Sequence, residues 1–318
     1  MSSRAAPKGD VRLGDRMFRR LTEASSLAVL VVLAAIAVFL VVQSLPAFRQ
    51  AGWHFLSEKQ WFPDQAKPRF GVAALAFGTV LASVLALLMA VPVAVGAALA
   101  LTELAPTRIG TWIGYLVDLL AAVPSVVYGL WGLYFLVRWM RPAEIWTARH
   151  LGFVPLFRDP SNSFGKSVFA ASVVLAVMIL PVIAAISREV FRQVPVGNRE
   201  AALALGATRW EMIRMAVLPP SRSGVTGGVM LGLGRALGET IAVALVLGSS
   251  FKIGFHVFEP GGNTIAANVA NKFGEAGKLG LHALIASGLV LFAITLAVNM
   301  AARSIVYRST RLAREATA

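Results

Sequence analysis

Hydrophobic residues are concentrated in six long segments, most of which carry no charged residue. A helix needs about 20 apolar residues to cross the hydrocarbon core of a bilayer, and these segments reach that length. The six segments cover residues 27–45, 71–101, 109–137, 167–187, 223–251 and 279–302. This pattern predicts an all-α polytopic membrane protein with about six transmembrane helices.

The polar segments between these spans divide the chain into parts with different expected locations. We expect a basic cytoplasmic N-terminal segment (1–24), a first membrane anchor with an external loop (25–70), a transmembrane core (71–302) that includes a cytoplasmic loop (188–222), and a cytoplasmic tail (303–318). Lysine and arginine are more frequent in the segments that this topology places in the cytoplasm. Because cytoplasmic loops are generally richer in these residues, both termini are expected to be cytoplasmic.

Composition supports a membrane protein and narrows the choice of partners. Hydrophobic residues make up 57% of the 318 residues and charged residues 14%, which lies outside the range of ordinary soluble domains. The formal net charge is +14, but the basic residues are spread around the membrane boundaries. We therefore expect them to face anionic lipid headgroups and no nucleic acid. The absence of cysteine and the four scattered histidines predict no metal site and no cofactor.

The loop at 188–222 contains the signals of two short helices. Asn198 is expected to cap the first helix and Gly206 to end it, while Thr208 and Glu211 form a capping-box pattern for the second. Two short helices on a membrane-protein loop suggest either a docking element for a partner groove or an amphipathic hairpin on the headgroups. The residues alone leave both possibilities open.

An arginine and a glutamate interrupt the apolar stretch LGLGRALGETIAV at residues 231–243. An arginine in the middle of a membrane helix costs about 2.5 to 3.5 kcal/mol on insertion scales. Arg235 and Glu239 are spaced i to i+4, so in a continuous helix they would share one face and could form an ion pair. The alternative, which we favour, is that Arg235, Glu239 and Thr240 line a hydrated translocation path, where a guanidinium suits an oxyanion.

Two further features of the spans have structural and functional interpretations. Glycines recur at intervals of four in the fifth span, which predicts close helix packing; they are Gly224, Gly228, Gly232, Gly234 and Gly238. Asp118 is a lone charge in the third span. It either reaches water at the membrane edge or has a role in transport, and the sequence does not separate these interpretations.

The sequence of the 188–222 loop resembles a known motif. The stretch EAALALGA begins at Glu200 and is followed at the right distance by Leu218 and Pro219, as in the EAA motif of bacterial ABC importer permeases. That resemblance implies a type I (MetI-like) importer fold in which a coupling helix contacts a cytoplasmic ATPase. The residues that would form this contact are Glu200, Ala201, Ala202, Leu205 and Gly206.

The resemblance extends over roughly residues 70–302. The segments FGTVLASVLALLMAVPVAVG, LLAAVPSVVYGLWGL, MILPVIAAISREVFRQVP and GLGRALGETIAVALVLG resemble the PstC-type permease subunits of phosphate importers. Sulphate and molybdate permeases typically have GEFGA where this chain has GETIA, from Gly238 to Ala242. They are the nearest alternative, and a PstA-type subunit is a more distant one.

The resemblance also implies a set of partners and a location. We expect a multi-pass protein of a bacterial cell membrane that pairs with a PstA-type permease, two PstB-type ATPase subunits and an extracytoplasmic phosphate-binding protein. The chain itself would be no enzyme, because ATP would be hydrolysed by the ATPase subunits and no cluster of catalytic residues stands out.

Overall fold

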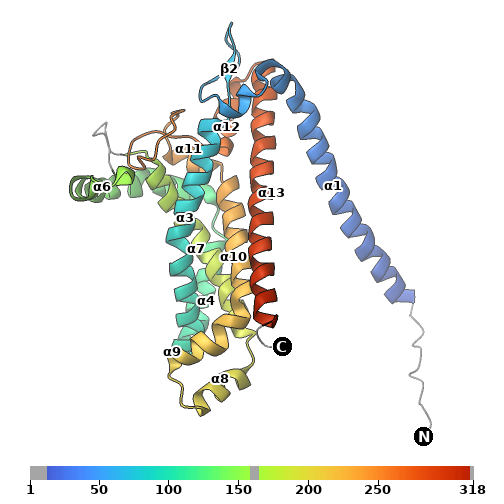
Figure 1. The fold of residues 1–318 in the computed structure, drawn as a ribbon, viewed down its shortest axis with the longest axis vertical. Helices are drawn as coiled ribbons and strands as arrows, with labels where there is room; N and C mark the ends of the chain where they lie inside the picture. The colour runs from blue at the N-terminus through green and yellow to red at the C-terminus, as the bar shows by residue number, and fades with distance from the viewer. Residues whose placement is uncertain (1–12, 158–164, 316–318) are drawn as a thin grey trace.

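The computed structural model describes residues 13–157 and 165–315, and the described chain is almost entirely helical (Figure 1). Parts of the predicted terminal segments, residues 1–12 and 316–318, lie outside this description. The long helices are α1 (Leu13–Ala51), α3 (Ala73–Leu99), α7 (Val168–Arg192), α10 (Leu218–Gly238) and α13 (Lys278–Glu315). Helices α3, α7, α10 and α13 form a bundle, from which α1 splays away (Figure 1). The predicted all-α fold class is confirmed.

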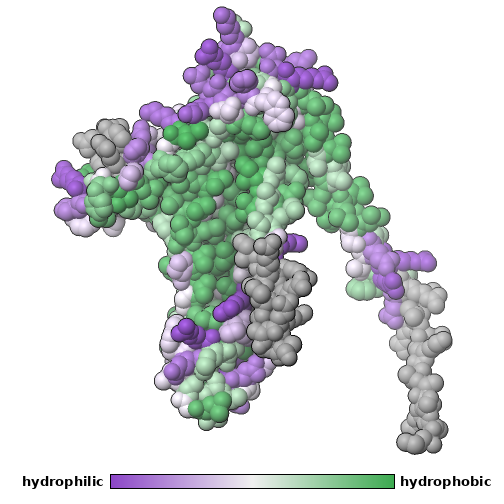
Figure 2. Space-filling model, in the orientation of Figure 1, coloured by the Kyte–Doolittle hydropathy of each residue, from purple (hydrophilic) through white to green (hydrophobic). Residues whose placement is uncertain are grey.

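The number of continuous spans is smaller than predicted. In the described residues, four helices are long and apolar enough to cross a bilayer, or five if one bent pair counts as a single span. Helix α10, in the fifth predicted span, lies within the bundle and has 21 residues, but it is not among these four. Figure 2 shows a broad apolar surface over the bundle with hydrophilic residues gathered at its two ends.

The predicted span at 109–137 is broken in two. Helix α4 (Thr107–Ala121) ends before Pro124. A second helical segment then runs through α5 (Ser125–Trp131), the π-helical turn η2 (Gly132–Leu136) and α6 (Val137–Leu151), and is bent by 89° from α4. Proline disfavours helical geometry in the residue before it, so a continuous span was the wrong expectation. Helix α6 projects sideways from the bundle (Figure 1).

The predicted span at 223–251 is also interrupted. Helix α10 ends at Gly238, Glu239 has extended backbone geometry (φ −69°, ψ 124°), and the short helix α11 (Ile241–Val246) follows. Broken helices at membrane depth are tolerated where the freed backbone groups find partners inside the protein. Arg235 and Glu239 therefore do not belong to one continuous helix.

Helix α7 is the centre of the bundle, and small residues let its neighbours approach closely. Helix α3 buries alanines at every fourth position, among them Ala82, Ala86 and Ala90, in a core cluster that includes residues of α7. On α10, a Cβ added at Gly224 would lie 2.6 Å from Val190, and one added at Gly232 would lie 2.8 Å from Ile183. Val190 and Ile183 both belong to α7. In lipid, such close contact supplies much of the energy of helix association.

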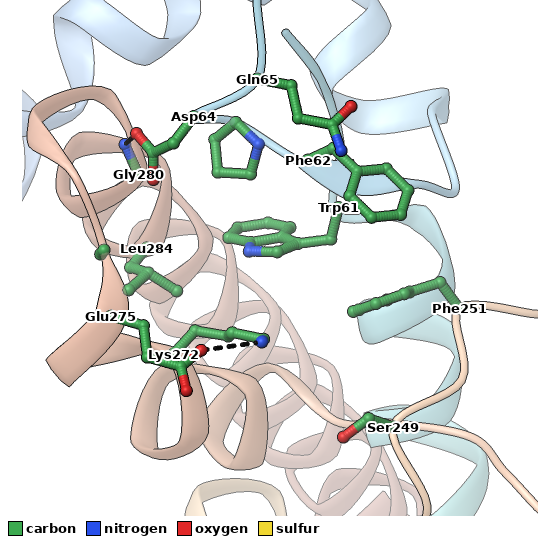
Figure 3. Close-up of a pocket in the computed structure, with 12 residues that line it drawn as sticks. Trp61, Phe62, Asp64, Gln65, Ser249, Phe251, Lys272, Glu275, Gly280 and Leu284 are labelled. Carbon is green, nitrogen blue, oxygen red and sulfur yellow. Dashed lines mark hydrogen bonds and ion pairs between the residues drawn. The ribbon is translucent and has the colours of Figure 1, made fainter.

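One end of the bundle carries a small cap, which we call the hairpin end. The cap contains α2 (His54–Ser57), the antiparallel strands β1 (Trp61–Phe62) and β2 (Arg69–Phe70), α12 (Ile265–Lys272) and the 3-10 turn η5 (Phe273–Glu275). The carboxylate of Asp64 accepts hydrogen bonds from the backbone N–H groups of Gly277 and Gly280, both at 2.9 Å, and so ties the hairpin to the start of α13. Figure 3 shows the adjoining pocket, of about 520 Å³.

The opposite end of the bundle, the coupling end, is formed by the helices of the 188–222 loop. These are α8 (Val196–Ala204), α9 (Arg209–Met212) and the π-helical turn η4 (Ile213–Val217), which leads directly into α10. A second π-helical turn, η1 (Ala100–Leu104), extends α3 at this end. Figure 1 shows α8 and α9 beyond the ends of α3, α7 and α10.

Candidate coupling surface and translocation site

The two short helices of the coupling end are located as predicted, with one difference at the start of α8. Helix α8 begins at Val196 after Pro195, so Asn198 lies inside it and does not cap it. Gly206 has φ +83° and ends the helix, because glycine adopts this left-handed geometry without a Cβ penalty.

The capping box of α9 is confirmed. The Glu211 backbone N–H donates to the Thr208 hydroxyl (3.3 Å), and the Thr208 backbone N–H donates to the Glu211 carboxylate (2.7 Å). The backbone hydrogen bond from Thr208, followed by that from its hydroxyl, lowers the pKa of Glu211. This carboxylate therefore stays charged where it supports the helix start.

An exposed hollow lies between α8 and the start of the next helical segment. The cavity measures about 570 Å³ and is lined by Ala201, Ala202, Leu205, Gly206, Ala207, Glu211, Met215 and Ala216. Leu205 is 89% exposed at its edge. Four of the five predicted coupling residues therefore meet at one surface, and Glu200 is exposed on the same helix. The surface can accept an apolar segment of another protein.

Arg199 fastens α8 to the rest of the coupling end, a role that no local signal in the sequence indicates. Its guanidinium donates to both carboxylate oxygens of Glu103, at 2.9 and 3.1 Å, and Glu103 lies in η1. The same guanidinium donates to the backbone carbonyls of Phe191 (2.7 Å) and Val194 beyond it. The Glu103 side chain is 4% exposed and that of Arg199 is 17% exposed, so this is a mostly buried bidentate pair of charged groups, which is a strong interaction.

A second ion pair joins α4 to α7. Arg188 on α7 donates through Nη2 to both carboxylate oxygens of Asp118 on α4, at 2.7 and 2.9 Å. The backbone of α4 makes room for the guanidinium at Gly114, where an added Cβ would lie 1.9 Å from Arg188 Nη1. Asp118 is thus an ion-pair partner whose side chain remains 45% exposed. No local signal in the sequence links these two residues.

Arg235 lies where α4 ends and borders an open cavity. Its Nη1 donates to the carbonyl oxygen of Ala121, the last residue of α4, at 3.4 Å. The cavity measures about 580 Å³ and is lined by Val182, Gly227, Met230, Leu231, Gly234, Arg235 and Asn299. An added Cβ at Gly234 or Gly238 would meet nothing within 4 Å, so these two glycines face open space. The guanidinium retains donors for a further acceptor.

The side chains of Glu239 and Thr240 bond to nearby backbone groups and not to Arg235. Within the described part of the chain, no ion pair joins Arg235 and Glu239. The alternative interpretation of their spacing, an intrahelical ion pair, does not fit this structure because α10 ends between them. Glu239 is 9% exposed and accepts from the Ala242 backbone N–H at 3.2 Å, which supports the start of α11. The Thr240 hydroxyl donates to the carbonyl of Gly238 at 3.1 Å.

Comparison with known proteins shows the family of the chain. The sequence profile of the binding-protein-dependent transport system inner membrane component family matches residues 90–311. The phosphate transport system permease protein PstC 2 of Mycobacterium tuberculosis is 45% identical over 298 residues, covering 92% of each chain. The PstC protein of Mesorhizobium japonicum is 41% identical over 313 residues, covering 96% of this chain and 94% of its own.

A solved structure shares the fold. The chain matches a bacterial ABC transporter involved in the import of the acidic polysaccharide alginate with a TM-score of 0.54 and 17% identity, over 91% of this chain and 99% of that one. The chain therefore belongs to the family of binding-protein-dependent transport system inner membrane components and, within it, to the PstC-type permease proteins of phosphate transport systems.

Proposed function

We propose that this chain is the PstC-type permease subunit of an ATP-driven phosphate importer, and that it forms the translocation path together with a PstA-type permease subunit. Two PstB-type ATPase subunits bind at the coupling end, and an extracytoplasmic phosphate-binding protein delivers phosphate at the hairpin end. The coupling end and both termini are then cytoplasmic. The chain has no nucleotide site of its own in this assembly.

The exposed hollow on the coupling surface is the observation that carries this proposal. It presents small and apolar side chains, among them Ala201, Ala202 and Leu205, on a short helix at the end of the bundle. Such a surface fits the groove of a partner better than it fits water. A secondary transporter or a channel works without an ATPase and has no need of such a surface.

Arg235 is the proposed contact for phosphate on the path. A guanidinium offers several N–H donors in a geometry that suits phosphate oxygens, and Arg235 borders an open cavity in the bundle. Arg235 donates to the carbonyl of Ala121, and Glu239 accepts from the backbone N–H of Ala242. Because the two side chains are not bonded to each other, the positive charge of Arg235 is available to an anion. A weak contact with one arginine lets the ion leave again, as transport requires.

Transport then follows from alternating access. ATP binding draws the two ATPase subunits together, α8 moves with them, and the pair of permease subunits changes the side on which the path is open. High-affinity selection of phosphate is left to the binding protein, which is why one modest site in the membrane suffices.

The test is the ATPase activity of the co-expressed complex reconstituted in lipid. We expect the binding protein loaded with phosphate to stimulate hydrolysis more than the empty protein or the protein exposed to sulphate. Stimulation by a sulphate-loaded or molybdate-loaded binding protein instead would retain the architecture and reject phosphate. Failure of any ATPase to co-purify in several mild detergents would reject the coupling surface itself.

A further inference from the structure

We infer that the Arg188–Asp118 pair is the link through which movement of α8 reaches Arg235. The inference rests on the proposed function, because it assumes that α8 is moved by an ATPase. It assigns Arg188 and Asp118 as positioning residues: neither contacts the substrate, and both act by holding α4 to α7. Three arginines, Arg199, Arg188 and Arg235, connect the coupling end to the candidate path in three steps.

The first step joins α8 to α7. Arg199 on α8 donates to the backbone carbonyl of Phe191, in the last turn of α7, at 2.7 Å, and also to that of Val194. The last carbonyls of a helix form the negative end of its dipole, so a cation bonded to them is stabilising. Together with the bidentate pair to Glu103, these bonds make α8 and the end of α7 move as one unit.

The second step joins α7 to α4. Arg188 lies one helical turn before Phe191 on the same helix, and both Nη2 bonds run to Asp118, at 2.7 and 2.9 Å. Arg188 is 9% exposed, and its guanidinium occupies the space that a side chain at Gly114 would fill. The guanidinium lies in a backbone notch and is held by two bonds from one nitrogen, so it resists sliding of one helix against the other.

The third step joins α4 to Arg235. Asp118 and Ala121 lie one turn apart in the last turn of α4, and the Ala121 carbonyl accepts from Arg235 Nη1 at 3.4 Å. Helix α4 stops there because of the break before Pro124. A displacement of α4 by Arg188 therefore changes the position of an acceptor of Arg235, and with it the direction in which the guanidinium points.

Structural pairs also hold helices together without transmitting anything, so the test must separate the two roles. Asp118→Asn alone would leave the mostly buried Arg188 charge without its partner, which destabilises a protein. The double variant Asp118→Asn/Arg188→Met removes both charges and keeps most of the volume, so folding is preserved while the link is lost. Glu189→Gln is the matched control, because Glu189 is the exposed carboxylate next to Arg188.

The readout is a thiol beside Arg235. The chain has no cysteine, so Gly234→Cys introduces a single one, with its Cβ in open space on the wall of the Arg235 cavity. The complex is reconstituted in nanodiscs with cysteine-free partner subunits. The labelling rate with a water-soluble maleimide is compared between the nucleotide-free and the ATP–vanadate-trapped states, and ATPase activity is measured on the same samples.

We expect the labelling rate of Gly234→Cys to differ between the two states in the parent and in the Glu189→Gln control. In the double variant this difference falls by about fivefold or more, the lower range of measured coupling effects, while the complex still assembles and is still trapped by vanadate. An unchanged difference in the double variant overturns the inference, as does a parent whose labelling rate does not respond to nucleotide. Absence of ATPase activity in the complex that lacks Gly234→Cys rejects the proposed function first.

Discussion

Two arginines within the helical bundle are each bonded to a group from a distant part of the chain. Arg188 pairs with Asp118, 70 residues away, and Arg235 bonds to the carbonyl of Ala121, 114 residues away. The two arginines differ in what remains available to a ligand. Arg188 is 9% exposed and bonded to the Asp118 carboxylate, whereas Arg235 makes one long bond and borders a cavity. The difference singles out Arg235 as the residue to test for transport.

Replacing Arg235 with glutamine should reduce phosphate uptake by about tenfold or more, because the change removes a charge-assisted hydrogen bond to the passing ion. The complex should still assemble, since the side chain makes a single 3.4 Å bond within the chain. Uptake of radiolabelled phosphate into proteoliposomes is the measurement, with size-exclusion chromatography as the assembly check. Arg222→Gln, an exposed arginine of the same helix, should leave uptake unchanged. Loss of assembly in Arg235→Gln would indicate a structural role.

Helix α7 is enclosed by small residues of its neighbours. The alanine face of α3 and one glycine face of α10 both pack on it, while the other glycines of α10 face open space. The predicted glycine pattern thus contains two groups with different surroundings. Gly224, Gly228 and Gly232 meet α7 within this chain, and Gly234 and Gly238 are open to the cavity or to a partner.

Gly224→Ala should destabilise the protein by about 1 to 3 kcal/mol, the usual cost of overpacking. The added methyl would lie 2.6 Å from Val190 Cγ2 and 3.2 Å from its Cβ, and a β-branched side chain on a helix has no alternative rotamer to move into. Gly227→Ala on the same helix meets nothing within 4 Å, and should be neutral or stabilising by up to about 1 kcal/mol. Thermal unfolding in mild detergent measures both. Equal destabilisation would contradict the packing argument.

The two ends of the molecule have different surfaces and therefore different expected partners. The hairpin end is a polar cap in which Asp64 fastens the β-hairpin to α13, whereas the coupling end offers an apolar hollow. Figure 1 shows α1 and α13 both running from the hairpin end towards the other end of the bundle. The described parts of both terminal helices therefore agree with two termini on one side of the membrane.

Single cysteines should reveal which side this is. The natural chain contains none, so Ala66→Cys near the hairpin and Arg209→Cys on α9, both exposed, can be labelled without background. We expect a membrane-impermeant thiol reagent to label Ala66→Cys in intact spheroplasts, and Arg209→Cys only after permeabilisation. Labelling in the opposite order would invert the orientation and would place the coupling surface out of reach of an ATPase.

Local signals in the sequence were sufficient to predict that this is a helical membrane protein, and to predict the two short helices of the coupling end. Mean hydropathy over 20-residue windows identifies membrane helices because insertion depends on the composition of one segment. The Thr208–Glu211 capping box and the stop at Gly206 were equally predictable, since both depend on residues three or fewer positions apart. The resemblance of the EAALALGA stretch to the EAA motif singled out α8 as the proposed coupling helix.

The breaks and pairings of the core were decided by tertiary structure. An apolar pattern does not report that α4 ends before Pro124 or that α10 ends at Gly238, because a helix break at membrane depth depends on whether neighbouring elements satisfy the freed backbone groups. The same holds for the charges: the i to i+4 spacing of Arg235 and Glu239 allowed a local ion pair as one of two interpretations. The actual partners, Ala121 for Arg235 and Asp118 for Arg188, come together only when α4, α7 and α10 pack.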